Sequence, residues 1–357
     1  MRLIHCSDLH LDSKMEANLT ARQAKERGGE ICATFARMVR WAQANEVRAI
    51  LLAGDLFDTR RVSTKTADFV VNTMKNAAKI DFFYLRGNHD GTRDPFAGRD
   101  LPENLHTFGT QWTGYEMGGV TIAGLELDRE NWETCYDDLR LDAEGLNIVM
   151  LHGQVSTQPG EELVCLPRLR GKHIDYLALG HIHSFRRERL DDRGQWCYCG
   201  CPEGRGFDEC GEKGFVLLDA ADGRVESRFI PFASRILHEV RVDISDCVTI
   251  TQLQQALERA AAGIPGDSMV KFTLVGSYTP ETQKDLGFLT RLLGEHFWFA
   301  RIKDESRFRM ERSSYEHDAS LKGQFIRLVM ASDRAEEDKA RIICAGLQAL
   351  AGEAVEV

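Results

Sequence analysis

Acidic, amide and imidazole side chains follow several apolar runs of this sequence, each at the point where a run ends. Carboxylates, amide oxygens and imidazoles are the groups with which proteins bind divalent metal ions. Open α/β sheets bind their ligands at the carboxyl ends of the strands, so side chains placed there can meet at one edge. The candidate metal ligands are Asp8, His10, Asp55, Asn88, His152, His181 and His183.

The turn Gly54–Asp58 carries the pair of carboxylates around which the other candidates are organised. It follows the apolar run 49–53, which is typical of a buried parallel strand. Asp55 offers two oxygens and can bridge two cations, which leaves Asp58 free to orient a neighbouring side chain. By itself the turn also fits ordinary loop chemistry, with an Asp capping a helix.

Asp8 and His10 follow a short predicted strand, residues 2–6. They are two residues apart, so an extended backbone would turn both side chains to one face and make half of a metal site. The alternative is a helix-capping Asp followed by a surface His.

Asn88 and His89 follow the predicted strand 80–85. The amide oxygen of Asn88 can ligate a metal without adding charge, and His89 can carry a proton near neutral pH. Contact with Asp58 would hold His89 in one tautomer and make it a better proton carrier. The alternative is a turn whose residues were selected for a left-handed backbone.

Three further histidines follow two more apolar strands. His152 comes after the run 147–151, and His181 and His183 follow the run 175–179 at a spacing that lets both face one side. If Asp55 is shared, the seven candidates can build two metal sites.

These residues must be positioned by a folded scaffold, and a length of 357 residues suggests about two domains. We expect a first domain over 1–232, a small α+β module over 235–332 and a C-terminal helix over 333–357. Apolar residues at helical spacing predict a helix from about 20 to 45, broken or bent at Gly28–Gly29. In the module, Thr279 is a candidate N-cap for a helix to residue 297.

Composition narrows the class of protein. The apolar fraction of 43% is enough for real cores. The ten cysteines are scattered, the first residues lack the apolar stretch of a signal peptide, and no run is long enough to span a bilayer, so we expect a reduced, cytoplasmic protein. The net charge of −10 argues against a general binder of polyanions, although metals and a local basic patch can still neutralise phosphates.

One group of cysteines stands apart from the others: Cys197, Cys199, Cys201 and Cys210. Their spacing is not the C-x₂₋₄-C pairing of structural zinc sites, and their role stays open. The neighbouring Gly204–Gly206 segment could bring backbone N–H groups or Arg205 to a phosphate, or it could be only a turn.

The ordered motifs at residues 8–10, 54–58, 87–90, 152–153 and 180–183 resemble those of the calcineurin-like metallophosphoesterase superfamily. The resemblance covers residues 1 to about 232. It is closer to the SbcD/YhaO-type DNA repair exonucleases, the nuclease subunits of double-strand-break repair complexes. The stretches that carry it are 5–12, 53–58, 176–183, 198–207 and 211–215, and relatives usually have Ser at the position of Cys201.

This resemblance implies a four-layer αββα sandwich with a smaller C-terminal capping domain, and two divalent metal ions, Mn²⁺ first, with Fe or Zn as alternatives. By position, one metal would be held by Asp8, His10, Asp55 and His183, and the other by Asp55, Asn88, His152 and His181. His89 would protonate the leaving 3′ oxygen, with Asp58 orienting it. Family members remove nucleotides from DNA ends in the 3′ to 5′ direction and often also cut single strands internally.

The resemblance also implies partners: DNA, an SMC-like coiled-coil ATPase of the SbcC type, and a second copy of the chain. The stretch after the module leaves little room for a long segment that docks onto an ATPase, so the sequence supports this partnership less than it supports the nuclease chemistry. The alternatives are a metal-dependent phosphatase, a cyclic-nucleotide phosphodiesterase, and a scaffold subunit for an ATPase. The turns GDLFDTR and GNHD differ from the usual phosphatase motifs, and a scaffold would be expected to have lost some ligands.

Overall fold

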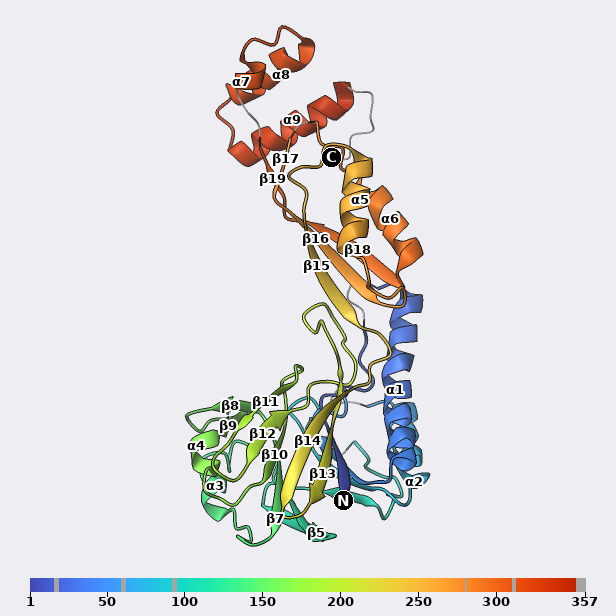
Figure 1. Ribbon diagram of the computed structural model, residues 1–357, viewed down its shortest axis with the longest axis vertical. Helices are drawn as coiled ribbons and strands as arrows, with labels where there is room; N and C mark the ends of the chain where they lie inside the picture. Colours follow the sequence, from blue (N-terminus) through green and yellow to red (C-terminus); the bar gives the residue numbers. More distant parts are fainter. Residues whose placement is uncertain (16–18, 59–61, 92–94, 280, 310–312, 351–357) are drawn as a thin grey trace. The chain divides into compact units, whose positions relative to one another are not determined.

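The computed structural model describes residues 1–15, 19–58, 62–91, 95–279, 281–309 and 313–350. The chain divides into two compact units, Met1–Ile236 and Leu237–Val357, which are drawn in Figure 1. Residues 351–357 of the predicted C-terminal helix lie outside the described residues.

The first sheet of unit Met1–Ile236 contains six strands. They are β1 (Arg2–Cys6), β2 (Val47–Ala53), β3 (Asp81–Leu85), β4 (Leu105–Thr107), β13 (Gly214–Ala221) and β14 (Arg224–Pro231). Their order across the sheet is β14-β13-β1-β2-β3-β4. The strands from β1 to β4 run parallel, and β13 and β14 form an antiparallel hairpin at one edge.

The second sheet also contains six strands. They are β5 (Thr113–Met117), β6 (Val120–Gly124), β7 (Leu146–His152), β10 (Tyr176–Gly180), β11 (Arg186–Arg189) and β12 (Gln195–Tyr198). Their order is β11-β12-β10-β7-β6-β5, with four parallel strands in the middle and an antiparallel strand at each edge. Between β7 and β10 in the sequence, the chain forms a short parallel pair of strands, β8 (Gln154–Ser156) and β9 (Leu163–Cys165).

The two sheets pack face to face because their strands are apolar on both sides. Alternate residues such as Leu51 and Met150 fill the core between the sheets. On the outer face of the first sheet, Ile50 packs against helices α1 (Ala21–Ala44) and α2 (Thr64–Lys75). On the outer face of the second sheet lie α3 (Cys135–Asp138) and α4 (Leu166–Leu169). This layering of helix, sheet, sheet and helix confirms the predicted fold class.

Helix α1 begins after a capping box in which Thr20 and Gln23 bond to each other's backbone N–H groups. Its buried face includes Phe35. The expected break at Gly28–Gly29 was wrong, since the helix is continuous through both residues. Each glycine costs about 1 kcal/mol relative to alanine. The capping box and the buried apolar face can offset that cost, because tertiary packing supplies most of the stability of a helix in a protein.

The unit Leu237–Val357 is a smaller α+β assembly. Its elements are β15 (Leu237–Asp243), α5 (Ile250–Ala260), β16 (Met269–Val275), β17 (Ser277–Tyr278), α6 (Leu286–His296), β18 (Phe299–Asp304), β19 (Arg307–Phe308), α7 (Ser313–Glu316), α8 (Leu321–Met330) and α9 (Glu336–Leu350). β15, β16 and β18 form a parallel sheet whose apolar residues pack against α5 and α6. Helix α6 begins later than predicted because Asp285, not Thr279, caps it by accepting a bond from the N–H of Phe288.

None of the helices in the described residues is both long and apolar enough to cross a bilayer.

The buried face of α1 generates a stability prediction. Replacing Phe35 with Ala should lower the free energy of unfolding of the metal-free protein by about 3–5 kcal/mol, because Phe35 is only 1% exposed and its removal leaves a cavity. Arg40→Ala on the exposed face of the same helix should change it by less than about 0.5 kcal/mol. Urea unfolding followed by circular dichroism measures both, and equal effects of the two substitutions would contradict the packing described.

Candidate metal centre

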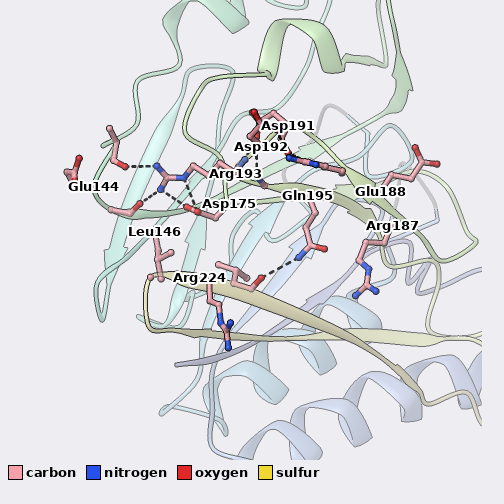
Figure 2. A pocket seen from close by; sticks show the side chains of 16 residues that line it. Glu144, Leu146, Asp175, Arg187, Glu188, Asp191, Asp192, Arg193, Gln195 and Arg224 are labelled. Atoms are coloured by element: carbon pink, nitrogen blue, oxygen red, sulfur yellow. Dashed lines mark hydrogen bonds and ion pairs between the residues drawn. The ribbon is translucent and has the colours of Figure 1, made fainter.

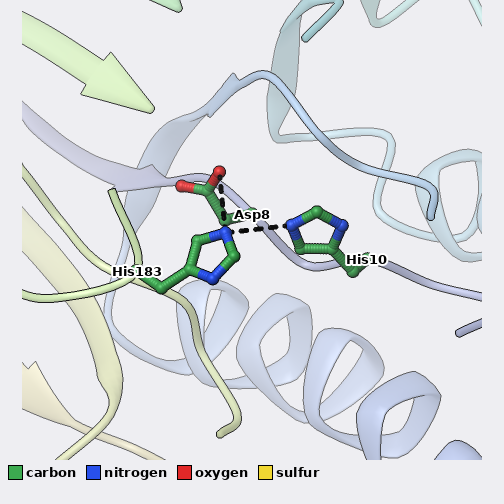
Figure 3. A group of neighbouring side chains, drawn as sticks. All are labelled: Asp8, His10 and His183. Atoms are coloured by element: carbon green, nitrogen blue, oxygen red, sulfur yellow. Dashed lines mark hydrogen bonds and ion pairs between the residues drawn. The ribbon is translucent and has the colours of Figure 1, made fainter. Parts of the chain in front are cut away.

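The loops that follow β1 and β10 bring together the first group of predicted ligands: Asp8, His10 and His183. The Nε2 atoms of His10 and His183 lie 3.2 Å apart, and Oδ1 of Asp8 lies 3.7 Å from Nε2 of His183. Figure 3 shows the three side chains pointing toward one another. Asp8 and His10 are almost fully buried. Two ring nitrogens and a carboxylate facing one point form a set of donors that a single cation can share.

A second group forms at the ends of β2, β3 and β7. Nε2 of His152 lies 3.4 Å from Oδ2 of Asp55 and 3.0 Å from Oδ1 of Asn88. Nδ1 of His181 lies 3.4 Å from the same Asn88 oxygen. Oδ2 of Asp55 also lies 3.8 Å from Nε2 of His10, which belongs to the first group. Asp55 therefore stands between the two groups, where a bridging carboxylate would be.

The backbone at four of these positions is left-handed. The φ angle is 53° at Asp8, 47° at His10, 51° at Asp55 and 101° at His181. The expectation that an extended backbone aligns Asp8 with His10 was therefore wrong in its reason, although the two side chains do converge. Left-handed non-glycine residues cost about 1–3 kcal/mol each and persist only where the surroundings hold them.

Hydrogen bonds between the loops provide that support. The N–H of Asp8 donates to the carbonyl of Gly54 at 3.0 Å, and the N–H of His10 donates to the carbonyl of Asp55 at 3.0 Å. The N–H of His181 donates to the carboxylate of Asp8 at 2.9 Å, which links the second sheet to the first. These bonds join the loops after three strands into one rigid edge.

Three glycines allow the ligands to approach the backbone. A Cβ on Gly54 would overlap the ring of His152, and a Cβ on Gly87 would overlap the carboxylate of Asp55. A Cβ on Gly180 would overlap the carbonyl of Ala53. The glycines of these motifs therefore leave room for the ligands, in addition to permitting turns.

Each histidine that turns Nε2 inward has its Nδ1 close to an outer partner. In His152, Nδ1 donates to the carbonyl of Ala53 at 2.9 Å. In His183, Nδ1 donates to Oε1 of Glu209 at 2.6 Å. These two bonds fix the ring tautomer and leave the Nε2 lone pair for a metal. In His10, Nδ1 lies 3.0 Å from Oδ1 of Asp58 without a well-aligned hydrogen bond.

Asp58 and His89 lie near each other, but their contact is loose. Nδ1 of His89 is 3.5 Å from Oδ1 of Asp58, whereas His10 and Arg205 both reach the same oxygen at 3.0 Å. The side chain of His89 is 47% exposed, in contrast to the buried His10. The structure thus places His89 at the open side of the centre, with Asp58 held by two other groups.

The electrostatics of the centre suit positive charge. Burial works against ionisation of Asp55, but its bond to His152 and the charges of His152 and His10 hold the pKa of that carboxyl far below its usual range. Conversely, burial opposes protonation of His152, yet the contact with Asp55 raises the pKa of His152 to about 9. Because the carboxylates of this site favour the positively charged form of a buried imidazole, they would also stabilise a bound cation. With its imidazole, carboxylate and amide donors, it fits a pair of divalent ions.

Three residues of the centre were not predicted in their roles. Glu209 is buried beneath His183, and bonds from His183 and Arg205 outweigh burial and lower its pKa to about 2. The guanidinium of Arg205 donates to carboxylates, so the expectation that it contacts a phosphate has no support.

Asp90 is buried under the turn and accepts from the N–H groups of Gly87 and Phe57 at 2.9 and 2.8 Å. Burial raises the pKa of Asp90 to about 7.

The cysteines do not form a metal site among the described residues. Cys197 and Cys199 lie in the core between the sheets, and Cys199 Sγ contacts Ser7 Oγ at 3.1 Å. Cys201 Sγ lies 3.7 Å from Oε2 of Glu209, and Cys210 contacts the carbonyl of Phe207. Burial raises the pKa of the Cys197 thiol to about 11, so this thiol is protonated and packs as a small apolar group.

A hollow of about 760 Å³ in this unit lies away from these ligands (Figure 2). Its walls include Leu146 at the start of β7 and Gln195 at the start of β12, so it is at the amino-terminal edge of the second sheet. The charged side chains there are largely paired with one another, as Arg193 is with Asp175. The candidate chemistry is at the opposite edge.

Comparisons with known proteins place this geometry in context. A family model described as calcineurin-like phosphoesterase matches residues 1–185, just over half of the chain. The uncharacterized metallophosphoesterase YhaO of Bacillus subtilis is 28% identical over 275 residues, covering 72% of this chain and 67% of YhaO. The SbcD component of the nuclease SbcCD from Escherichia coli K12 is 26% identical, covering 64% of this chain and 67% of that protein. DNA double-strand break repair protein Mre11 of Methanosarcina acetivorans is 22% identical, covering 68% of this chain and 41% of that protein.

The tight approach of Gly87 to Asp55 generates a prediction about metal binding. Gly87→Ala should weaken the binding of Mn²⁺ by about tenfold or more, because the added methyl group displaces the carboxylate that both groups share. Gly109→Ala is the matched control, since nothing lies within 4 Å of a Cβ at that position. Isothermal titration with Mn²⁺ measures both variants, and unchanged binding in Gly87→Ala would show that Asp55 is not a ligand.

Proposed function

The chain belongs to the calcineurin-like phosphoesterase family, and from that premise we propose that it is a two-metal DNA exonuclease. It would hydrolyse phosphodiester bonds from 3′ ends and also cut single strands internally. The names of the similar proteins, a nuclease component and a double-strand break repair protein, support DNA as the substrate. The observation that carries the proposal is the convergence of the seven candidate ligands, with a half-exposed His89 beside them.

We propose that two divalent ions share Asp55. The first would be held by Asp8, His10, Asp55 and His183, and the second by Asp55, Asn88, His152 and His181. When bound, such a pair polarises the phosphoryl group, lowers the pKa of the attacking water and offsets charge on both reacting oxygens. Mixed carboxylate and imidazole donors suit Mn²⁺, with Fe or Zn as alternatives.

His89 would act as the general acid in this proposal. Its ring stands edge-on to His10, with ring centres 4.8 Å apart, so its nitrogen atoms lie close to the ligands without being buried among them. Its exposure lets it reach a scissile phosphate and give a proton to the leaving 3′ oxygen. Asp58 is within 3.5 Å of its Nδ1, and such contacts often tighten only when substrate is bound.

We propose three further features from the resemblance and from the names of the similar proteins. The unit Leu237–Val357 would act as a capping domain for DNA, the protein would work with an SMC-like ATPase, and two copies would pair. The similarity to YhaO covers 72% of the chain and so extends beyond the 185 residues that match the family.

The general acid generates an activity prediction. His89→Ala should lower kcat for Mn²⁺-dependent release of label from linear DNA ends by about 10²–10⁴-fold, because one proton transfer loses its donor. Binding of Mn²⁺ should persist, because His89 is outside both proposed ligand sets. The assay uses the purified chain, end-labelled DNA and a parallel reaction with p-nitrophenyl phosphate.

His106→Ala is the matched control. His106 is also paired with an aspartate, because its Nε2 lies 2.7 Å from Oδ1 of Asp81, but Asp81 is at the start of β3, the end away from Asn88 and His89. This variant should retain full activity. Turnover of p-nitrophenyl phosphate with DNA left intact would replace the nuclease by a phosphatase. Inactivity of the wild-type chain on both substrates despite bound metal would instead favour a scaffold or an absent ATPase partner.

Metal removal should destabilise the unit Met1–Ile236. A ligand at one hundred times its Kd stabilises the folded state by about 2.7 kcal/mol per site. We therefore expect saturating Mn²⁺ to raise the unfolding temperature above that in EDTA, and the rise to be smaller in Asn88→Ala, which would lose a ligand of the second ion. Calorimetry with and without EDTA measures the shift. An identical unfolding temperature in both conditions would argue against a preformed centre.

A further inference from the structure

Arg205 connects the two carboxylates that hold the histidines of the first group. Its Nη1 donates to Oδ1 of Asp58 at 3.0 Å, and its Nη2 donates to Oε1 of Glu209 at 3.1 Å. The same Asp58 oxygen lies 3.0 Å from Nδ1 of His10, and the same Glu209 oxygen lies 2.6 Å from Nδ1 of His183. One guanidinium thus bridges two separate carboxylate–histidine pairs.

The consequence is a symmetric arrangement of two imidazoles. Nδ1 of each ring lies beside a carboxylate oxygen, at 3.0 Å in His10 and 2.6 Å in His183, and the two Nε2 atoms on the other side of the rings are 3.2 Å apart. The second group is supported differently, since Nδ1 of His152 bonds to a backbone carbonyl in β2. That bond does not depend on Arg205.

We propose that Arg205 is a positioning residue that fixes both histidines of the first metal position through Asp58 and Glu209. Its loss would weaken binding at that position and leave the second position intact. This inference rests on the two-metal centre of the proposed function, but not on the identity of its substrate.

The chemistry of arginine suits this role. A planar guanidinium offers several N–H donors in a fixed fork and can serve two carboxylates at once, whereas an ammonium group is a point charge on a flexible stem. Glu209 is further held by the backbone N–H of Arg205 at 2.7 Å, so the loop itself grips the carboxylate. Without the guanidinium, Asp58 and Glu209 would keep their negative charges near Asp8 with no cation between them.

The simpler alternative is that Arg205 only neutralises buried charge and supports the fold. In that case its removal would lower stability and affect both metal positions equally, or neither. The two ideas therefore differ in metal stoichiometry, which can be measured without any substrate.

The test is Mn²⁺ binding by the full chain, followed by electron paramagnetic resonance in the absence of nucleic acid. In Arg205→Met we expect one ion to bind as in the wild type and the other to bind about 10–100-fold more weakly. In Arg205→Lys, the affinity for the weakened ion should lie between those of the wild type and Arg205→Met, because lysine keeps the positive charge but not the planar fork of donors. Adding His152→Ala to Arg205→Met should weaken the remaining ion as well, which identifies the position that Arg205 controls.

Arg193→Met is the matched control, because Arg193 also bonds to a carboxylate but lies at the opposite edge of the sheet. It should bind both ions as the wild type does. Glu209→Ala removes the acceptor of His183 and should show the same selective loss, which keeps the test decisive if Arg205→Met does not fold. Wild-type binding of both ions in the folded variants, or equal weakening of both, would overturn the proposal. Because no DNA is present, failure here is distinct from failure of the nuclease function.

Discussion

The centre depends on one constraint: acidic and imidazole groups must be packed within a few ångströms of Asp55, away from water. Desolvation opposes its charge, and contact with His152 and His10 restores it. Several features follow from this crowding. The glycines next to Asp55 and His152 have no room for a side chain. The left-handed residues are held by bonds between loops, since a strained backbone persists only where its surroundings fix it.

The strands serve this constraint by ending at the same edge. The first sheet supplies Asp8, Asp55 and Asn88 from loops after three adjacent parallel strands, and the second supplies His152 and the residues after β10. The bond from His152 to the carbonyl of Ala53 and the bond from His181 to Asp8 cross from one sheet to the other. The centre is therefore also a junction, and the sheets cannot shift against each other without separating the ligands within each group.

The sequence was sufficient to predict which candidate ligands gather at one edge, because each follows an apolar strand and parallel strands end together. The layered fold was predicted from the resemblance of the ordered motifs to a known superfamily. The sequence was not sufficient for the local geometry, since Asp8 and His10 converge through left-handed turns that i, i+2 spacing does not reveal. Glu209 was missed because a carboxylate that acts through a histidine 26 residues away has no spacing signal. The helix through Gly28–Gly29 shows tertiary burial overriding local propensity.

The contrast between His89 and the other imidazoles of the centre bears on whether the chain only binds metal. His10 and His152 are buried; Nδ1 of His152 bonds to the carbonyl of Ala53, and Nδ1 of His10 lies 3.0 Å from Asp58. His89 is half exposed, and its contact with Asp58 is the longest of that carboxylate's contacts to His10, Arg205 and His89. A scaffold would need the buried ligands but not His89, whereas a hydrolase needs a proton donor that substrate can reach. The arrangement is thus better explained by catalysis than by metal-dependent folding alone.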